Sequence, residues 1–147
     1  MNPVDVTTSI DVARSRQEVA TYAADPDSAP EWYANIDQVR WETEKPLRVG
    51  TRVAFVARFL GRTLSYTYEV LEHVPGELLV MATSEGPFPM ETTYTWADAP
   101  GGRTRMTLRN RGRPSGFAGI TAPLMAAAMR RANRKDLRAL MALLERS

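Results

Sequence analysis

The chain has 147 residues, with 19 lysines and arginines against 17 aspartates and glutamates, one histidine and no cysteine. A chain of this length is expected to form one domain spanning residues 1–147, and the lack of cysteine excludes disulfides and thiolate chemistry. The near balance of charge gives no reason to expect a nucleic-acid partner. No apolar run approaches the roughly 20 residues of a membrane-spanning helix, and the segment MNPVDVTTSI lacks the features of a signal peptide. We therefore expect a cytoplasmic protein without stable membrane insertion, either a monomer or a homodimer.

The first 42 residues predict a strand, two short helices and a second, brief strand. In VDVTTSIDV (4–12), every second residue from Val4 to Val12 falls on one largely apolar face, which is the period of a half-buried strand. Ser15 followed by Glu18 is a capping-box pattern, so a short helix is expected to begin there. The Asp-Pro pair at 25–26 ends this helix and can itself cap and open the second one. The segment IDQVRWE (36–42) then reads as the brief strand.

Residues 51–110 predict a run of hairpins that form an antiparallel sheet with one face covered. Five segments alternate in the manner of strands: RVAFVARF, TLSYTYEVLE, LLVMATS, METTYTW and RTRMTLRN. Turn sequences such as VPGE and ADAPGG separate them. The residues expected to face inward are Val53, Phe55, Ala57, Phe59, Leu64, Tyr66, Tyr68, Val70, Met90, Thr92, Tyr94, Trp96, Thr104, Met106 and Leu108.

The residues from about 120 to 145 predict one long helix. This stretch has no glycine, and its only proline, Pro123, can occupy the first turn. At 1.5 Å per residue the helix would be roughly 39 Å long, enough to cross a sheet of seven strands. Its inward stripe is predicted to be Leu124, Ala128, Ala132, Leu137, Leu140 and Leu144. Its water-facing side is predicted to carry Arg130, Arg131, Arg134 and Arg138.

Several local sequences in this order of elements resemble the START-like or SRPBCC superfamily, and within it the polyketide cyclase/dehydrase-like branch. They are YAADPDSAPEW, VGT before a strand, GRTLSYTYEVLEHVPGELL, GPF before TTYTW, GGRTRMTL, and RGRPSG before a helix that ends DLRALMALLE. The resemblance covers nearly the whole chain. It implies an α+β helix-grip fold: a curved, seven-stranded antiparallel sheet around the long C-terminal helix, with two short helices after the first strand. The superfamily holds lipid carriers, hormone receptors, allergens, cyclases and chaperone activators, so function has to be argued from the site.

A curved sheet cannot touch the helix everywhere, so this fold implies a cavity. A dry cavity of about 300 Å³ would cost on the order of 7 kcal/mol. Total stability is about 5–15 kcal/mol, so the space should hold water or a ligand, or be filled by large side chains. In the family the short helices close one end of the sheet, so Trp32 is expected to plug that end; simple core packing is the alternative.

The inward aromatic residues suggest that the cavity binds a ligand. Tyr66, Tyr68, Tyr94 and Trp96 bring three phenols and an indole, each of which needs a polar partner when buried. The alternative is an ordinary core in which the tyrosine hydroxyl groups reach the edge and meet water. Flexible methionine side chains can adapt to ligands of varied shape, although their use in filling irregular gaps in a core explains their presence equally well. The residues expected to contact a ligand are Trp32, Phe55, Phe59, Tyr66, Tyr68, Met81, Met90, Tyr94, Trp96, Met106, Met125 and Met129.

Candidate catalytic groups are few. With one histidine, His73 in a turn, and no cysteine, no Ser-His, Cys-His or histidine-rich metal constellation can form, so neither a metal nor a cofactor is expected. Glu85 and Glu91 near one strand end could act as acid and base or be solvated charges. Arg109 could fix an anionic head group, although strand alternation places it on the outer face.

Three classes of function follow from these observations. The preferred one is binding of a small, largely apolar molecule, such as a lipid, polyketide or isoprenoid, between sheet and helix. The second is a polyketide cyclase or dehydratase that uses a pocket tyrosine or carboxylate. The third is a protein-interaction module of the chaperone-activator or toxin-system type. The glycine-rich segment 110–120 could gate the cavity or simply connect strand and helix.

Overall fold

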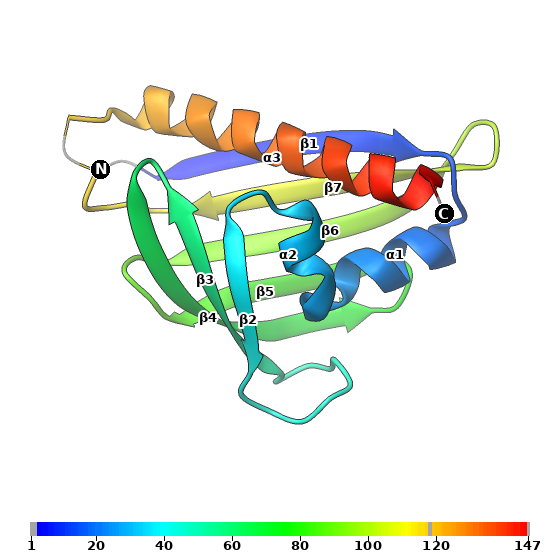
Figure 1. The fold of residues 1–147 in the computed structure, drawn as a ribbon, viewed down its shortest axis with the longest axis horizontal. Coiled ribbons are helices and arrows are strands. Elements are labelled where there is room, and N and C mark those ends of the chain that lie inside the picture. The colour runs from blue at the N-terminus through cyan, green and yellow to red at the C-terminus, as the bar shows by residue number, and fades with distance from the viewer. Residues whose placement is uncertain (1–2, 118, 147) are drawn as a thin grey trace.

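The computed structural model describes residues 3–117 and 119–146. The elements follow the predicted order, and the helix-grip fold is confirmed (Figure 1). The helical elements are α1 (Arg16–Ala24), the 3-10 helix η1 (Pro26–Ser28), α2 (Ala29–Trp32) and α3 (Ala122–Arg146). The strands are β1 (Val4–Val12), β2 (Ile36–Trp41), β3 (Arg52–Phe59), β4 (Arg62–Val74), β5 (Leu78–Glu85), β6 (Met90–Ala99) and β7 (Arg103–Gly112).

The sheet has seven antiparallel strands in the order β1-β7-β6-β5-β4-β3-β2. Its inner face carries the predicted apolar set: Phe55 lies opposite Tyr66, and Trp96 lies opposite Met106. Register shifts interrupt the pairing of β4 with β5 and of β2 with β3. Such irregularities bend strands and increase their twist. In Figure 1 the β2–β4 end of the sheet accordingly turns away from the direction of β1 and β7.

Ion pairs between neighbouring strands cover the outer face. Arg105 forms a bidentate pair with Asp11, with N–O distances of 2.8 and 3.1 Å. Arg109 does the same with Asp5, at 2.9 and 2.6 Å. Each arginine holds the pKa of its aspartate below the usual range through hydrogen bonding. The prediction that Arg109 faces outward is therefore confirmed.

The sequence between β1 and β2 forms its helices through the predicted caps. The Ser15 hydroxyl accepts a hydrogen bond from the Glu18 N–H at 3.2 Å, and α1 ends where expected. The Asp25 carboxylate accepts a bond from the Asp27 N–H at 3.0 Å and so caps η1. Ser28 then donates to the Asp25 carbonyl at 2.8 Å and fixes the turn into α2. These bonds hold the two short helices beside one end of the sheet.

The long helix α3 is present, but its orientation and its inward stripe both differ from the prediction. It packs along β1 and contacts α2, and in Figure 1 it runs in much the same direction as β1 and β7 rather than across all seven strands. Leu124, predicted to be inward, is 61% exposed. The buried side chains of α3 are Met125, Met129, Asn133, Asp136, Leu137 and Leu140. Of the arginines predicted to face water, Arg131, Arg134 and Arg138 are exposed, whereas Arg130 is half-buried.

The reason for the shifted stripe lies in how the helix is held. Its C-terminal end is attached to the β1–α1 connection, where the Ala13 N–H donates to the Glu145 carboxylate at 2.8 Å. Leu137 and Leu140 are fully buried at that end. With those two positions inward, helical spacing brings Met129, Asn133 and Asp136 toward the sheet and turns Leu124 away from it. The stripe that contains Met125 and Met129 therefore points inward together with Leu137 and Leu140, and Leu124 does not.

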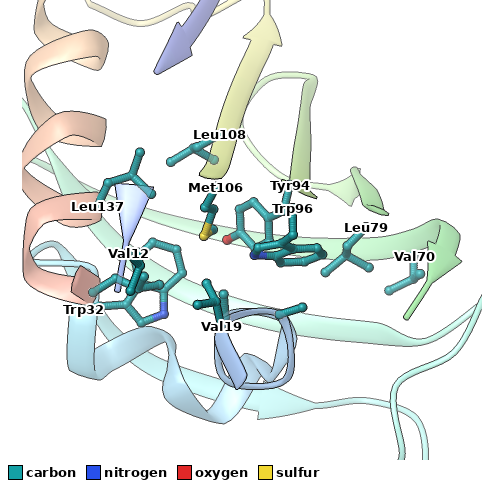
Figure 2. Packing of buried hydrophobic residues seen from close by; sticks show 13 residues of the cluster. Val12, Val19, Trp32, Val70, Leu79, Tyr94, Trp96, Met106, Leu108 and Leu137 are labelled. Carbon is teal, nitrogen blue, oxygen red and sulfur yellow. The ribbon is translucent and has the colours of Figure 1, made fainter. Parts of the chain in front are cut away.

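The core forms two main clusters. One lies under α1, α2 and the C-terminal half of α3, and includes Trp32, Tyr94, Trp96 and Met106. Figure 2 shows Trp32 close to Val12 and Val19, with Tyr94 and Trp96 side by side beyond them. The other cluster lies under the N-terminal half of α3 and contains Tyr66, Phe88, Phe117 and Met125. None of the helices in the described part of the chain has the length and apolar character needed to span a membrane.

Candidate functional site

A cavity of about 190 Å³ lies between the inner face of the sheet and α3. If it were dry, it would cost on the order of 5 kcal/mol, a large share of a typical stability of about 5–15 kcal/mol. Nine of the twelve predicted residues line it: Phe55, Phe59, Tyr66, Tyr68, Met81, Met90, Tyr94, Met125 and Met129. The cavity itself was therefore correctly expected from the curvature of the sheet.

Trp32, Trp96 and Met106 do not line the cavity, which corrects their predicted positions. All three are buried in the core beside it. The Trp32 ring packs against Tyr33 and Tyr94, with centroids 4.1 and 5.9 Å apart. Its indole N–H donates to the Ser28 hydroxyl at 3.3 Å. Trp32 thus supports the wall of the cavity from behind instead of plugging its end.

The cavity has a polar side built around two tyrosines. Tyr33 follows α2 directly, and its hydroxyl is hydrogen-bonded to that of Tyr94 on β6, at an O–O distance of 2.5 Å. Burial raises the pKa of both phenols well above the usual value, and the nearby Asp136 carboxyl raises it further. Both hydroxyls therefore stay protonated at neutral pH. One of them donates within the pair, and the other keeps a proton that it can donate to a bound molecule.

Asp136 on α3 adds a buried carboxyl to this side. It is 4% exposed, lines the cavity, and accepts a hydrogen bond from the Ala34 N–H at 3.0 Å. Burial raises the pKa of Asp136 to about 6, although the Ala34 N–H and the positive charge of Lys135 both favour the ionised form. A carboxyl that titrates near neutrality inside a cavity can exchange a proton with a bound molecule.

Two further asparagines, Asn110 and Asn133, also line the cavity. Asn110 on β7 accepts a hydrogen bond from the Thr92 hydroxyl at 2.6 Å, so its side-chain oxygen is already occupied. Asn133 on α3 is 6% exposed, and its side-chain nitrogen has no hydrogen-bond partner among the described residues. A buried donor without a partner is costly, so a bound molecule or water is expected beside it.

The other side of the cavity is aromatic. Tyr66, Phe88 and Phe117 form a chain of edge-to-face contacts, with centroids 5.6 and 5.8 Å apart. Phe117 belongs to the 110–120 segment, whose Pro114 lines the cavity. Arg62 lies over the Phe117 ring and donates to the Ser115 carbonyl at 3.1 Å. The segment therefore borders the cavity as expected; its action as a gate stays a prediction.

The remaining candidate groups lie away from the cavity. Glu85 is exposed, and Glu91 pairs with Arg111 at 2.8 Å, so these two carboxylates do not form an acid-base pair in the site. His73 lies near the end of β4 instead of in the turn itself, and partial burial lowers its pKa. Among the described residues, no group of three or more histidine, cysteine, aspartate or glutamate side chains could hold a metal ion.

The sequence reasoning missed Tyr33, Asn133, Asp136, Asn110 and Phe88, all of which line the cavity. A signal for two of them was present. Asn133 and Asp136 follow Met125 and Met129 at helical spacing, on the stripe that ends in Leu140. Polar residues interrupting an apolar stripe are candidates for a buried site. Tyr33 carries no comparable signal, because the sequence does not show which of the adjacent Trp32 and Tyr33 lines the cavity.

Comparisons with known proteins agree with this fold. Residues 3–145 match the model of the family described as "Polyketide cyclase / dehydrase and lipid transport". A START superfamily protein from Mycobacterium smegmatis superposes with a TM-score of 0.83 at 12% identity, covering 97% of both chains. The aromatase/cyclase Zhui from Streptomyces gives 0.81 at 18% identity, covering 99% of this chain and 95% of that one. A major latex-like protein from Panax ginseng gives 0.75 at 11% identity, with 95% and 96% covered. None of the curated proteins matches the chain.

Proposed function

We propose that this chain, which belongs to the polyketide cyclase/dehydrase and lipid transport family, binds a small, largely apolar molecule between its sheet and α3. The observation that carries this proposal is a cavity whose lining is mostly aromatic and aliphatic, with a smaller number of polar side chains among them. Such a combination is typical of small-molecule sites, in which apolar burial supplies affinity and a few polar groups supply orientation.

Apolar burial is expected to supply most of the affinity. Each 100 Å² of apolar ligand surface removed from water contributes about 2.5 kcal/mol. Phe55, Tyr66 and Met129 offer such contacts from the sheet and from the helix. The Tyr33–Tyr94 pair offers a hydroxyl proton that can orient a polar atom of the ligand.

A cavity-filling variant tests this proposal. Ala132 lines the cavity from α3, whereas Ala127 on the same helix is exposed. Binding of the neutral dye N-phenyl-1-naphthylamine would be followed by fluorescence, and native mass spectra would reveal co-purifying molecules. Ala132→Phe is expected to weaken dye binding at least about tenfold because it occupies the space, whereas Ala127→Phe should leave it unchanged. Equal binding by both variants, or no binding by the wild type, would contradict the proposal.

One observation also favours the enzyme alternative, a cyclase or dehydratase. Asp136, with a pKa near 6, lies beside two protonated tyrosines in the same cavity. In such a reaction the Asp136 carboxylate would take a proton from the carbon next to a ketone, and a tyrosine hydroxyl would stabilise the enolate oxygen. The enolate would then re-form the ketone and break the C–O bond at the β-carbon, and Asp136 would return the proton to the departing hydroxyl group, which leaves as water. The test is the rate at which a β-hydroxyketone loses water to give an ultraviolet-absorbing enone. The wild type should accelerate this reaction and Asp136→Asn should not; no acceleration by the wild type would favour a carrier.

A further inference from the structure

Asn133 and Asp136 form an unusual pair at the polar side of the cavity. They are three residues apart on α3, so their side chains lie on the same face of the helix. Both are more than nine-tenths buried, and both line the cavity. Asn133 brings an amide nitrogen that has no hydrogen-bond partner among the described residues. Asp136 brings a carboxyl of which Oδ1 accepts the Ala34 N–H, which leaves Oδ2 for another donor.

The charges around the cavity restrict what can approach this pair. Besides Asp136, the described lining contains two charged side chains, Asp25 and Arg58, and both are exposed. Arg58 is already paired with Asp37, at an N–O distance of 3.0 Å. Lys135, next to Asp136 on the helix, is exposed. The ionisable groups that share the buried part of the lining with Asp136 are tyrosines, so an anionic head group would meet a carboxylate there and no buried cation.

We propose that the cavity selects an uncharged alcohol or phenol, whose hydroxyl accepts a hydrogen bond from Asn133 Nδ2 and donates one to Asp136 Oδ2. This inference rests on the proposed binding function and adds the class of head group. A hydroxyl is the smallest group that both accepts and donates, so it satisfies both residues at once. A ketone would satisfy Asn133 alone, an ammonium group would satisfy Asp136 alone, and a carboxylate would be repelled by Asp136.

Three probes with one ring system test this selection. 2-Naphthol carries the hydroxyl, naphthalene lacks it, and 2-naphthoate replaces it with an anion. Their dissociation constants would be measured with the full chain at about pH 8, where Asp136 is ionised. The hydroxyl should make 2-naphthol bind about tenfold more tightly than naphthalene. This factor is the net effect of two modest hydrogen bonds after the cost of removing water from the hydroxyl is subtracted. 2-Naphthoate should bind more weakly than both.

Two variants connect the selection to the pair. Asn133→Leu removes the amide at similar size and should abolish the preference for 2-naphthol while changing naphthalene affinity less than about twofold; Asn133→Ala serves if the leucine overpacks. Asp136→Asn removes the negative charge and should raise the affinity for 2-naphthoate about tenfold or more. Arg134→Ala, on the exposed face of α3, is the control and should change none of the three affinities.

The outcomes separate this inference from the proposal on which it rests. Equal binding of 2-naphthol and naphthalene, or tighter binding of 2-naphthoate, would overturn the selection for a hydroxyl and leave apolar binding intact. A 2-naphthol preference that survives in both Asn133 variants would overturn the role of the amide. Failure of all three probes, together with failure of the neutral dye, would overturn the binding function itself.

Discussion

Replacing Asp136 with asparagine is expected to remove a large pH dependence of stability. The pKa of Asp136 is about 6 in the folded chain, against an ordinary value of 3.8. Because the folded state holds this proton more tightly, the stability that the group contributes is fully present below about pH 3.8 and is lost as the pH rises through about 6. The two pKa values differ by about 2.2, and at 1.36 kcal/mol per pKa unit the loss is about 3 kcal/mol. For a chain of this size that corresponds to roughly 6–12 °C in Tm.

The assay is urea unfolding of the wild type and Asp136→Asn at several pH values between about 4 and 8. Asparagine keeps an oxygen for the Ala34 N–H and adds an amide donor; the effect of that donor does not vary with pH. Other titrating groups, among them His73 and the paired Asp5 and Asp11, are common to both proteins and cancel in the difference. The variant should therefore gain about 2.4 kcal/mol on the wild type between about pH 4 and 8, because a small part of the full loss has already occurred at pH 4. A difference that stays constant with pH would refute the raised pKa.

Two further predictions concern packing next to the site. Trp32→Phe should lower the free energy of unfolding by about 1–3 kcal/mol. It should leave the affinity for the neutral dye unchanged, because Trp32 does not line the cavity. A large loss of affinity without a loss of stability would contradict this position of Trp32. Gly112→Ala should also lower the free energy of unfolding by about 1–3 kcal/mol, because the added carbon would overlap the Pro89 carbonyl oxygen and Met90 Sδ. An unchanged Tm would contradict this close approach of Gly112 to Pro89 and Met90.

The sheet could be predicted well because one face of it is buried. When the period is two residues, a single apolar face fixes which side chains point inward, and Phe55, Tyr94 and Met106 followed that rule. Thr67, expected on the outer side of β4, is buried. It lies at a register shift between β4 and β5. Alternation carries no information about where such a shift occurs, since the shift depends on the partner strand.

Which face of α3 points inward could not be predicted, for a different reason, although the polar residues on the methionine stripe gave a signal once that face was known. Two stripes overlap on this helix: one begins at Leu124, and the other runs through Met125, Met129 and Asn133. Hydrophobicity favours the leucine, but the methionine stripe is the one that is buried, and the C-terminal end of the helix is attached to the β1–α1 connection. That attachment joins residues 132 positions apart in the sequence. Helical periodicity is a local property and contains no record of it.

The free-energy cost of the polar pair is itself an argument that it serves a ligand. Ionised Asp136 costs the folded state about 3 kcal/mol at neutral pH, and the unpartnered amide of Asn133 adds about 1–3 kcal/mol. An unpaired buried donor alone does not mark a site, since the Trp96 indole N–H also has no partner among the described residues and Trp96 does not line the cavity. What distinguishes Asn133 and Asp136 is that both costs occur on one turn of one helix and both side chains face the same cavity. A fold selected for stability alone would place apolar side chains at both positions, as it does at Leu137 and Leu140, whereas a hydroxyl bound between the two residues would offset both costs together.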